Sequence, residues 1–207
     1  MLRKFVIGLL LFLSVILLSH CDVLSPVKLQ PVSSYTITGW PNEKRIPIYT
    51  QSSSTLLVTL PTAASGYQSS DMIYVTVPYK LKPYANNRWV APPADLLLPL
   101  LTQSLRSIGY FRAVVTSPFS GMTTYQLNTR LLMLQQEFLQ PISQVRFILE
   151  VTLMQSLTGK IISNRVFSIV VSAPNNNPYG GVLATNQAAN ALSKQIAQFV
   201  VQKAKSK

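Results

Sequence analysis

The chain has 207 residues, of which 48% are hydrophobic and 12% charged, so it holds ample material for a buried core. Its 18 Lys and Arg against 6 Asp and Glu give a net charge of +12, which favours anionic neighbours such as phospholipid headgroups, lipopolysaccharide, nucleic acid or an acidic protein. The one histidine and the one cysteine, His20 and Cys21, are adjacent near the amino end. Histidine-dependent nucleophilic catalysis and a Cys/His zinc site are therefore excluded for the rest of the chain.

The acidic residues do not replace this missing chemistry. Those beyond the amino-terminal region are not spaced as pairs: Glu43, Asp71, Asp95, Glu137 and Glu150. No G-x-x-x-x-G-K-[ST] motif is present, so the chain is not itself the ATPase of a transporter. We predict that the protein is not an enzyme and has no cofactor and no metal site. A hydrolase with an unrecognised site is the enzymatic alternative.

Residues 1–20 are predicted to form a signal peptide. Two basic residues, Arg3 and Lys4, precede an apolar run of 14 residues, which is too short for a spanning helix of about 20 residues. The following Leu18-Ser19-His20-Cys21 resembles a bacterial lipobox, although His20 stands where a small residue is usual. This resemblance implies cleavage before Cys21 and acylation of its sulfur, with chains such as palmitate holding the protein on a membrane.

Residues 21–33 contain two prolines and no periodicity, which predicts an extended tether between the lipid and a folded domain. Asp22, directly after the anchor, resembles the inner-membrane retention signal of enterobacterial lipoproteins. An exported chain rarely meets nucleic acid, and the aromatic residues are not interleaved with basic runs. We therefore exclude nucleic acid as a partner.

The next segment predicts two strands and a loop. Alternation over residues 34–40 indicates a first strand, which a charged turn follows at 41–45. The apolar run at 56–60 indicates a short buried strand. Residues 62–70 have the composition of a loop, in which Tyr67 is either a surface contact or a side chain that folds back as a plug.

Residues 71–110 contain the most informative pattern of the chain. A strand is predicted from Met72 to Val77, and Pro78 interrupts it, so a second extended piece is expected from Tyr79 to Tyr84. Residues 85–89, Ala-Asn-Asn-Arg-Trp, are predicted to form a polar knuckle that leads into a helix.

The helix is predicted to follow Pro92 and Pro93, because proline lacks the N–H group that a first helical turn leaves unpaired. Asp95 is placed to accept hydrogen bonds from the other free N–H groups of that turn. Pro99 is expected to remove one backbone bond, and Gly109 to cap the carboxyl end. The apolar side chains that repeat at helical spacing form one buried stripe: Leu97, Leu101, Leu105 and Ile108.

The second half of the chain predicts a meander and a helix. Residues 111–115 indicate a short buried strand, and three alternating runs follow, each apolar on one side: 125–133, 145–153 and 161–171. A loop is predicted at 174–181, and an amphipathic helix from about 183 to 203. These elements predict one α/β domain, with a mixed, mostly antiparallel β-sheet and two main helices packed on it.

The order Tyr84-Ala85-Asn86-Asn87-Arg88-Trp89, Pro92-Pro93 and a leucine-rich helix resembles the ABC-type transport auxiliary lipoproteins, the PqiC/YmbA-like family. The resemblance extends over about residues 34–203. Members of that family are periplasmic, lipid-anchored and not enzymes, and they occur with MCE-type lipid transport systems. The resemblance implies a signal peptide at 1–20, a tether at 21–33 and a family domain at 34–207. It further implies an accessory role in intermembrane lipid transport, with MCE-type or other ABC-transport subunits as partners.

Location and contacts follow as expectations. Family members are usually placed on the outer membrane, which we favour, whereas Asp22 indicates the inner membrane. Arg88 and Trp89 are our candidates for a partner-binding site, although for Trp89 we favour packing beneath the helix. Binding of anionic phospholipid and homo-oligomerisation stay open. The alternative function is a structural envelope lipoprotein that binds glycans or assembles a secretion machine.

Overall fold

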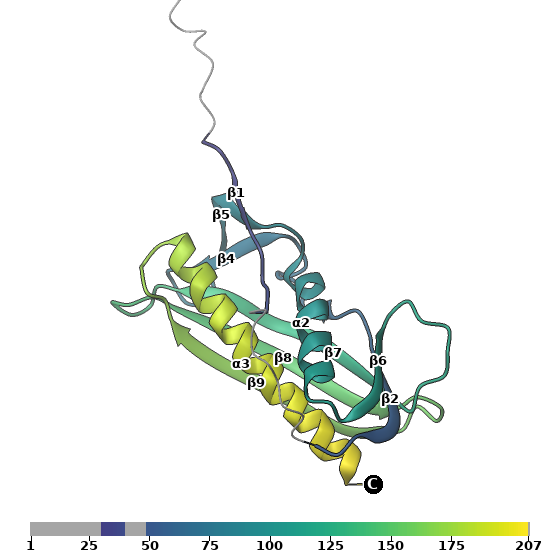
Figure 1. Cartoon of the computed structure of the whole chain (residues 1–207). Coiled ribbons are helices and arrows are strands. Elements are labelled where there is room, and N and C mark those ends of the chain that lie inside the picture. Colours follow the sequence, from purple (N-terminus) through teal and green to yellow (C-terminus); the bar gives the residue numbers. More distant parts are fainter. Residues whose placement is uncertain (1–29, 40–48, 207) are drawn as a thin grey trace, which may run out of the picture. The chain divides into compact units, whose positions relative to one another are not determined.

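The computed structural model describes residues 30–39 and 49–206 (Figure 1). From Val32 onward the chain forms one compact unit. The expectations for the signal peptide, for Cys21 and for the charged turn at 41–45 lie outside the described residues.

The described residues form a mixed nine-stranded sheet and two helices, which confirms the expected α/β class. The helices are α2 (Pro93–Ser107) and α3 (Pro178–Lys205). The strands are β1 (Ser33–Tyr35), β2 (Ser52–Val58), β3 (Thr62–Ala63), β4 (Asp71–Val75), β5 (Leu81–Trp89), β6 (Phe111–Thr116), β7 (Tyr125–Glu137), β8 (Gln144–Gln155) and β9 (Ile161–Ser172).

The longest strand, β7, organises the sheet. One of its edges pairs with β8, which pairs in turn with β9, and both pairings are antiparallel, as the alternating runs predicted. The other edge pairs in succession with β2, β3 and β4, all parallel. Three short strands thus share one long edge, because 13 residues of β7 offer more backbone donors and acceptors than any one of them can satisfy.

Both helices cover the same side of the long strands. Helix α3 contacts β8 and β9, and α2 packs against α3 and β6 (Figure 1). Side chains from both helices and from the facing side of the sheet form one buried core. The opposite side of β7, β8 and β9 is here called the open face.

Helix α2 agrees with its sequence pattern. Leu97, Leu101 and Leu105 are each 1% exposed, and Gly109 has φ 71, the left-handed conformation of a helix-ending glycine. The expected cap by Asp95 is wrong as a side-chain cap: the N-cap is Pro92, no side chain bonds there, and Asp95 lies exposed in the first turn. Its carboxylate acts there only through the helix dipole.

The predicted polar knuckle at 85–89 is wrong. Strand β5 continues through Trp89, because β1 pairs in parallel with Asn87, Arg88 and Trp89, while β4 places Asp71 opposite Arg88. The first strand ends at Tyr35 rather than at residue 40. This polar segment is a strand because it pairs with β1, which lies more than 50 residues away in the chain.

The predicted loop at 174–181 is also wrong at its end, because α3 begins at Pro178. The Asn177 side chain accepts a hydrogen bond of 2.7 Å from the Gly180 N–H and forms the N-cap. Proline in the first helical turn costs no hydrogen bond. Gly180 and Gly181 follow in the first turn of α3, and glycine suits both positions because a Cβ would collide with the Asn175 backbone or the Gln136 side chain.

A bulge in β7 changes which side chains face the helices. Its register with β8 shifts between Leu131 and Met133, so Leu134 is buried where the alternation had placed Met133. Met133 is half-buried instead. Beyond the bulge, Gln135 and Glu137 belong to the open face, which a strictly alternating strand would not allow.

Candidate docking surface

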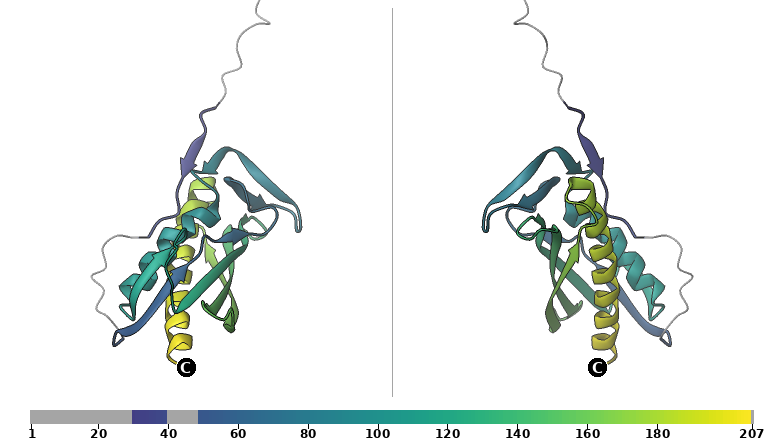
Figure 2. Two further views of the ribbon diagram at one scale, coloured as in Figure 1. Left: turned by 90° about the vertical axis from the view of Figure 1, so that its right-hand side faces the viewer. Right: turned by 90° about the vertical axis from the view of Figure 1, so that its left-hand side faces the viewer.

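Strands β4 and β5 form a hairpin that projects from the body on the side away from α3 (Figure 2). Its tip, defined here as residues 76–82, closes with a bond from the Lys80 N–H to the Val77 carbonyl at 3.1 Å. Three apolar tip side chains are exposed: Val77 at 54%, Tyr79 at 103% and Leu81 at 43%. Exposed apolar side chains that cluster in this way are typical of interaction sites.

Tyr79 has φ 68, and it is the only non-glycine residue with positive φ in the part of the chain that the structure describes. A bulky residue is disfavoured in this region, and such outliers cluster at functional positions. The backbone therefore directs the Tyr79 ring into solvent, where the ring contributes nothing to the core.

The hairpin is firmly held at its base. The rings of Tyr74 and Tyr84 lie 4.5 Å apart, and the Tyr84 hydroxyl donates to Gln136 Oε1 at 3.0 Å. Burial, together with the neighbouring Tyr74, raises the pKa of Tyr84, so this hydroxyl keeps its proton and stays a donor. Lys82 Nζ lies 6.0 Å from the centre of the Tyr74 ring. The exposed tip thus stands on a rigid support.

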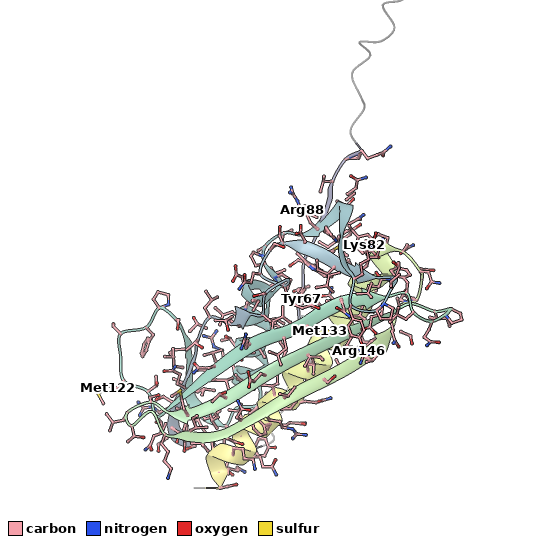
Figure 3. The ribbon with its side chains drawn as sticks, turned by 180° about the vertical axis from the view of Figure 1, so that it is seen from behind. Tyr67, Lys82, Arg88, Met122, Met133 and Arg146 are labelled. Atoms are coloured by element: carbon pink, nitrogen blue, oxygen red, sulfur yellow. The ribbon has the colours of Figure 1, made fainter. Side chains whose placement is uncertain are left out.

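Arg88 and Trp89, the two residues chosen from the sequence, lie on opposite sides of β5. Trp89 is 3% exposed and belongs to the core, as favoured above. The backbone N–H of Trp89 donates a hydrogen bond of 2.8 Å to the Ser70 carbonyl. Arg88 is exposed (Figure 3). Contact with a partner therefore falls to Arg88 rather than to Trp89, and its role in binding stays a prediction.

Tyr67 folds back onto the open face, which decides between the two interpretations of this residue. It is 8% exposed, and its hydroxyl donates to Gln135 Oε1 at 2.6 Å. Gln135 Nε2 in turn donates to Glu137 Oε1 at 2.8 Å. These bonds hold the loop between β3 and β4 against the carboxyl-terminal end of β7 (Figure 3).

Glu137 is the centre of this polar network. Arg146 donates two hydrogen bonds to its carboxylate, at 2.8 and 3.0 Å, and Gln144 donates a third at 3.3 Å. Burial by itself would raise the pKa of Glu137, but the bonds from Arg146 and Gln135 outweigh it and hold the pKa below its ordinary value. Both carboxylate oxygens are occupied, so this network fastens the loop and offers no free base.

Residues 30–39 and 49–206 contain no group of three or more His, Cys, Asp or Glu side chains that could hold a metal. No helix in these two ranges is long and apolar enough to cross a bilayer. What the described surface offers instead is a rigid hairpin with an apolar tip and two lysines, Lys80 and Lys82.

Reasoning from the sequence missed the hairpin tip. The sequence predicts that Pro78 interrupts two extended pieces, whereas it lies in the turn that joins them. A signal was present, because Val77-Pro78-Tyr79-Lys80 places a turn residue between two strand-like segments. The exposure of Tyr79 had no such signal, since an aromatic residue beside a strand is more often buried.

The comparisons with known proteins agree with this fold. A crystal structure of a protein from Xanthomonas campestris superposes with a TM-score of 0.75 at 19% identity, covering 84% of this chain and 98% of that one. The crystal structure of an uncharacterized protein gives a TM-score of 0.64 at 17% identity, covering 83% and 99%. At these identities the likeness shows a shared fold alone.

At the level of sequence, no curated protein matches the chain. The model of one family, the ABC-type transport auxiliary lipoprotein component, matches residues 35–197. This range contains both helices up to residue 197 and all strands except most of β1. The chain therefore belongs to the family of ABC-type transport auxiliary lipoprotein components.

Proposed function

We propose that this protein is a lipid-anchored, non-enzymatic accessory of an MCE-type ABC lipid transport system, on the periplasmic face of a Gram-negative cell membrane. The observation that carries the proposal is the family match over residues 35–197. The lone cysteine of the chain, at the end of an apolar leader, adds the anchor. Together they favour a body that holds and connects other components.

The anchor in this proposal is Cys21. Several acyl chains, at about 0.8 kcal/mol per buried CH₂, hold a protein stably on a bilayer, whereas a single chain does so only marginally. The segment 21–33 then serves as the tether, and residues 34–207 as the docking domain. We favour the outer membrane, with Asp22 as the argument for the inner one.

The hairpin tip is the part of the surface best suited to contact a transport subunit. An exposed aromatic residue on a rigid support loses little conformational freedom on binding, and aromatic residues dominate the binding energy of interfaces. Lys80 and Lys82 add positive charge at the tip itself, which would steer it toward an acidic patch of the partner.

Affinity purification of the intact lipoprotein from membranes of its own host, followed by mass spectrometry, tests this function. We expect a permease, an ATPase and an MCE-domain protein to be enriched. Tyr79→Gly removes the ring while suiting the positive φ, and it should lower their recovery several-fold, since an aromatic hot spot contributes on the order of 2 kcal/mol.

Met122→Ala is the matched control. Met122 is 84% exposed on a loop far from the hairpin, and its removal should leave the recovery of transport subunits unchanged (Figure 3). An eluate of the unchanged protein that contains no transport subunit would refute the proposal. Secretion-machine or glycan-bound components in their place would support the structural alternative.

A further inference from the structure

A second surface feature lies at the other end of the molecule. A cavity of about 560 Å³ opens between the carboxyl-terminal half of α3 and β9, which run side by side (Figure 1). Its size falls in the range of small-molecule sites, about 300–1,000 Å³. It is lined by two cationic side chains, three glutamines and three aromatic rings. None of these residues takes part in the docking surface above.

The two cations, Arg165 and Lys205, are positioned by aromatic rings. The Arg165 guanidinium carbon lies 4.9 Å from the centre of the Phe167 ring and 5.8 Å from that of Phe199. Lys205 Nζ lies 4.3 Å from the centre of the Tyr49 ring. Cation–π contacts at these distances orient a charge without neutralising it.

No carboxylate competes for these charges within the described lining of the cavity, where no residue is acidic. Glu150, the acidic residue of β8, which pairs with β9, accepts a hydrogen bond from Asn164. Because neighbouring side chains of a strand point to opposite faces, Asn164 and Glu150 lie on the open face and Arg165 on the helix side. The positive charge is therefore available to a ligand.

Helix α3 adds neutral donors beside the cations. Gln195, Gln198 and Gln202 are exposed, and their spacing of three and four residues places them on one side of the helix. Each amide offers two N–H donors. The helix dipole opposes an anion at this end, but the cations Lys203 and Lys205 in the last turn offset it.

We propose that this cavity binds a phosphate group, with Arg165 and Lys205 as the charged donors and the glutamines as neutral ones. Charge-assisted hydrogen bonds of this kind are typical of phosphate sites. The Phe167 and Phe199 rings, 5.4 Å apart, provide an apolar floor that suits the glycerol of a phospholipid headgroup better than a free phosphate ion. This inference goes beyond the proposed function, which requires no ligand on the body of the protein.

Calorimetric titration of the purified full chain in non-ionic detergent tests the site. The probes are glycerophosphoglycerol, which is a headgroup without acyl chains, then inorganic phosphate, and glycerol as the neutral probe. We expect both phosphates to bind and glycerol to give no signal. Tighter binding of glycerophosphoglycerol would assign the site to lipid headgroups, and equal or tighter binding of inorganic phosphate to the free ion.

The variant Arg165→Gln/Lys205→Gln should weaken phosphate binding by at least about tenfold, and since both side chains are exposed its melting temperature should hardly change. Arg130→Gln is the matched control, because it removes an equally exposed charge from β7 on the open face. An equal loss in Arg130→Gln, or unchanged binding in the double variant, would overturn the proposal. No transport subunit takes part in the titration, so its outcome is independent of the purification experiment.

Discussion

At the scale of single residues, Tyr79 combines two features that seldom occur together, full exposure and a positive φ. A left-handed conformation costs a residue with a Cβ roughly 1–2 kcal/mol. The rest of the hairpin tolerates this cost because the Tyr84–Gln136 bond and the paired strands hold the turn in place. The positive φ therefore lowers the stability of the fold at a residue whose side chain makes no core contact.

Substitutions at Tyr79 should separate backbone strain from side-chain contacts. We expect Tyr79→Gly to change the free energy of unfolding by less than about 1 kcal/mol, because relief of strain offsets the greater freedom of glycine in the unfolded chain. Tyr79→Val should destabilise by about 1–2 kcal/mol, because β-branched residues tolerate positive φ worst. Urea unfolding measures both, and equal stability of the two variants would contradict the assignment of strain.

Glu137 should make stability depend on pH. Its pKa in the folded protein is lower than its ordinary value of about 4.5, so its contribution is fully present above that pH and is lost as pH falls through the folded pKa. We expect Glu137→Gln to cost about 1–3 kcal/mol at pH 7, as for a hydrogen-bonded charge. The difference between the two proteins should shrink below pH 4.5.

Urea unfolding between pH 7 and pH 3 measures this difference. Glu150→Gln is the control, because its carboxylate accepts a single bond of 3.3 Å from Asn164. If the difference in free energy of unfolding between Glu137→Gln and the unchanged protein stays constant with pH, the ionised network is ruled out.

At the scale of elements, the sequence predicts a helix or strand correctly where its pattern of buried side chains lies within the segment itself. The buried stripe of helix α2 and the antiparallel strands β7 to β9 agree with the prediction up to the bulge in β7, because a buried stripe or an alternating run is contained within the segment itself. The sequence does not predict that strand β5 continues through Asn87, which has low strand propensity, because β1 supplies the partners of Asn87, Arg88 and Trp89 from a distant part of the chain.

The start of α3 offers a test of close packing. We expect Gly180→Ala to destabilise by about 1–3 kcal/mol, although alanine favours helices, because the new Cβ would collide with the Asn175 backbone. Thermal unfolding measures this loss. Gln187→Ala, at an exposed position of the same helix, should stay within about 0.5 kcal/mol. A stabilising Gly180→Ala would show that helix propensity outweighs contact there.

At the scale of the whole molecule, the net positive charge and the proposed lipid anchor would act together. A basic body suits a surface rich in anionic lipid, and an acylated cysteine would keep it there. The hairpin tip and the α3–β9 cavity involve different residues, so one body could hold a partner and a phosphate group at the same time.

Removing the anchor tests the proposed attachment. We expect Cys21→Ser to move the protein from the membrane fraction to the soluble periplasmic fraction or to leave its leader uncleaved, because no sulfur remains to be acylated. Cell fractionation and the mass of the amino-terminal peptide measure this change. Met122→Ala should stay with the membrane. A free thiol on Cys21 in the unchanged protein would refute the lipid anchor.

The sequence by itself determined the elements whose pattern is local, the near absence of reactive side chains and the family. Only the tertiary structure decided that β5 runs through Trp89, that a bulge turns Glu137 toward the open face, and that Arg165 and Lys205 line one cavity. These features depend on backbone pairing and on side chains that are distant in the chain. Periodicity within a segment reports which side is buried, but not which segment will lie beside it.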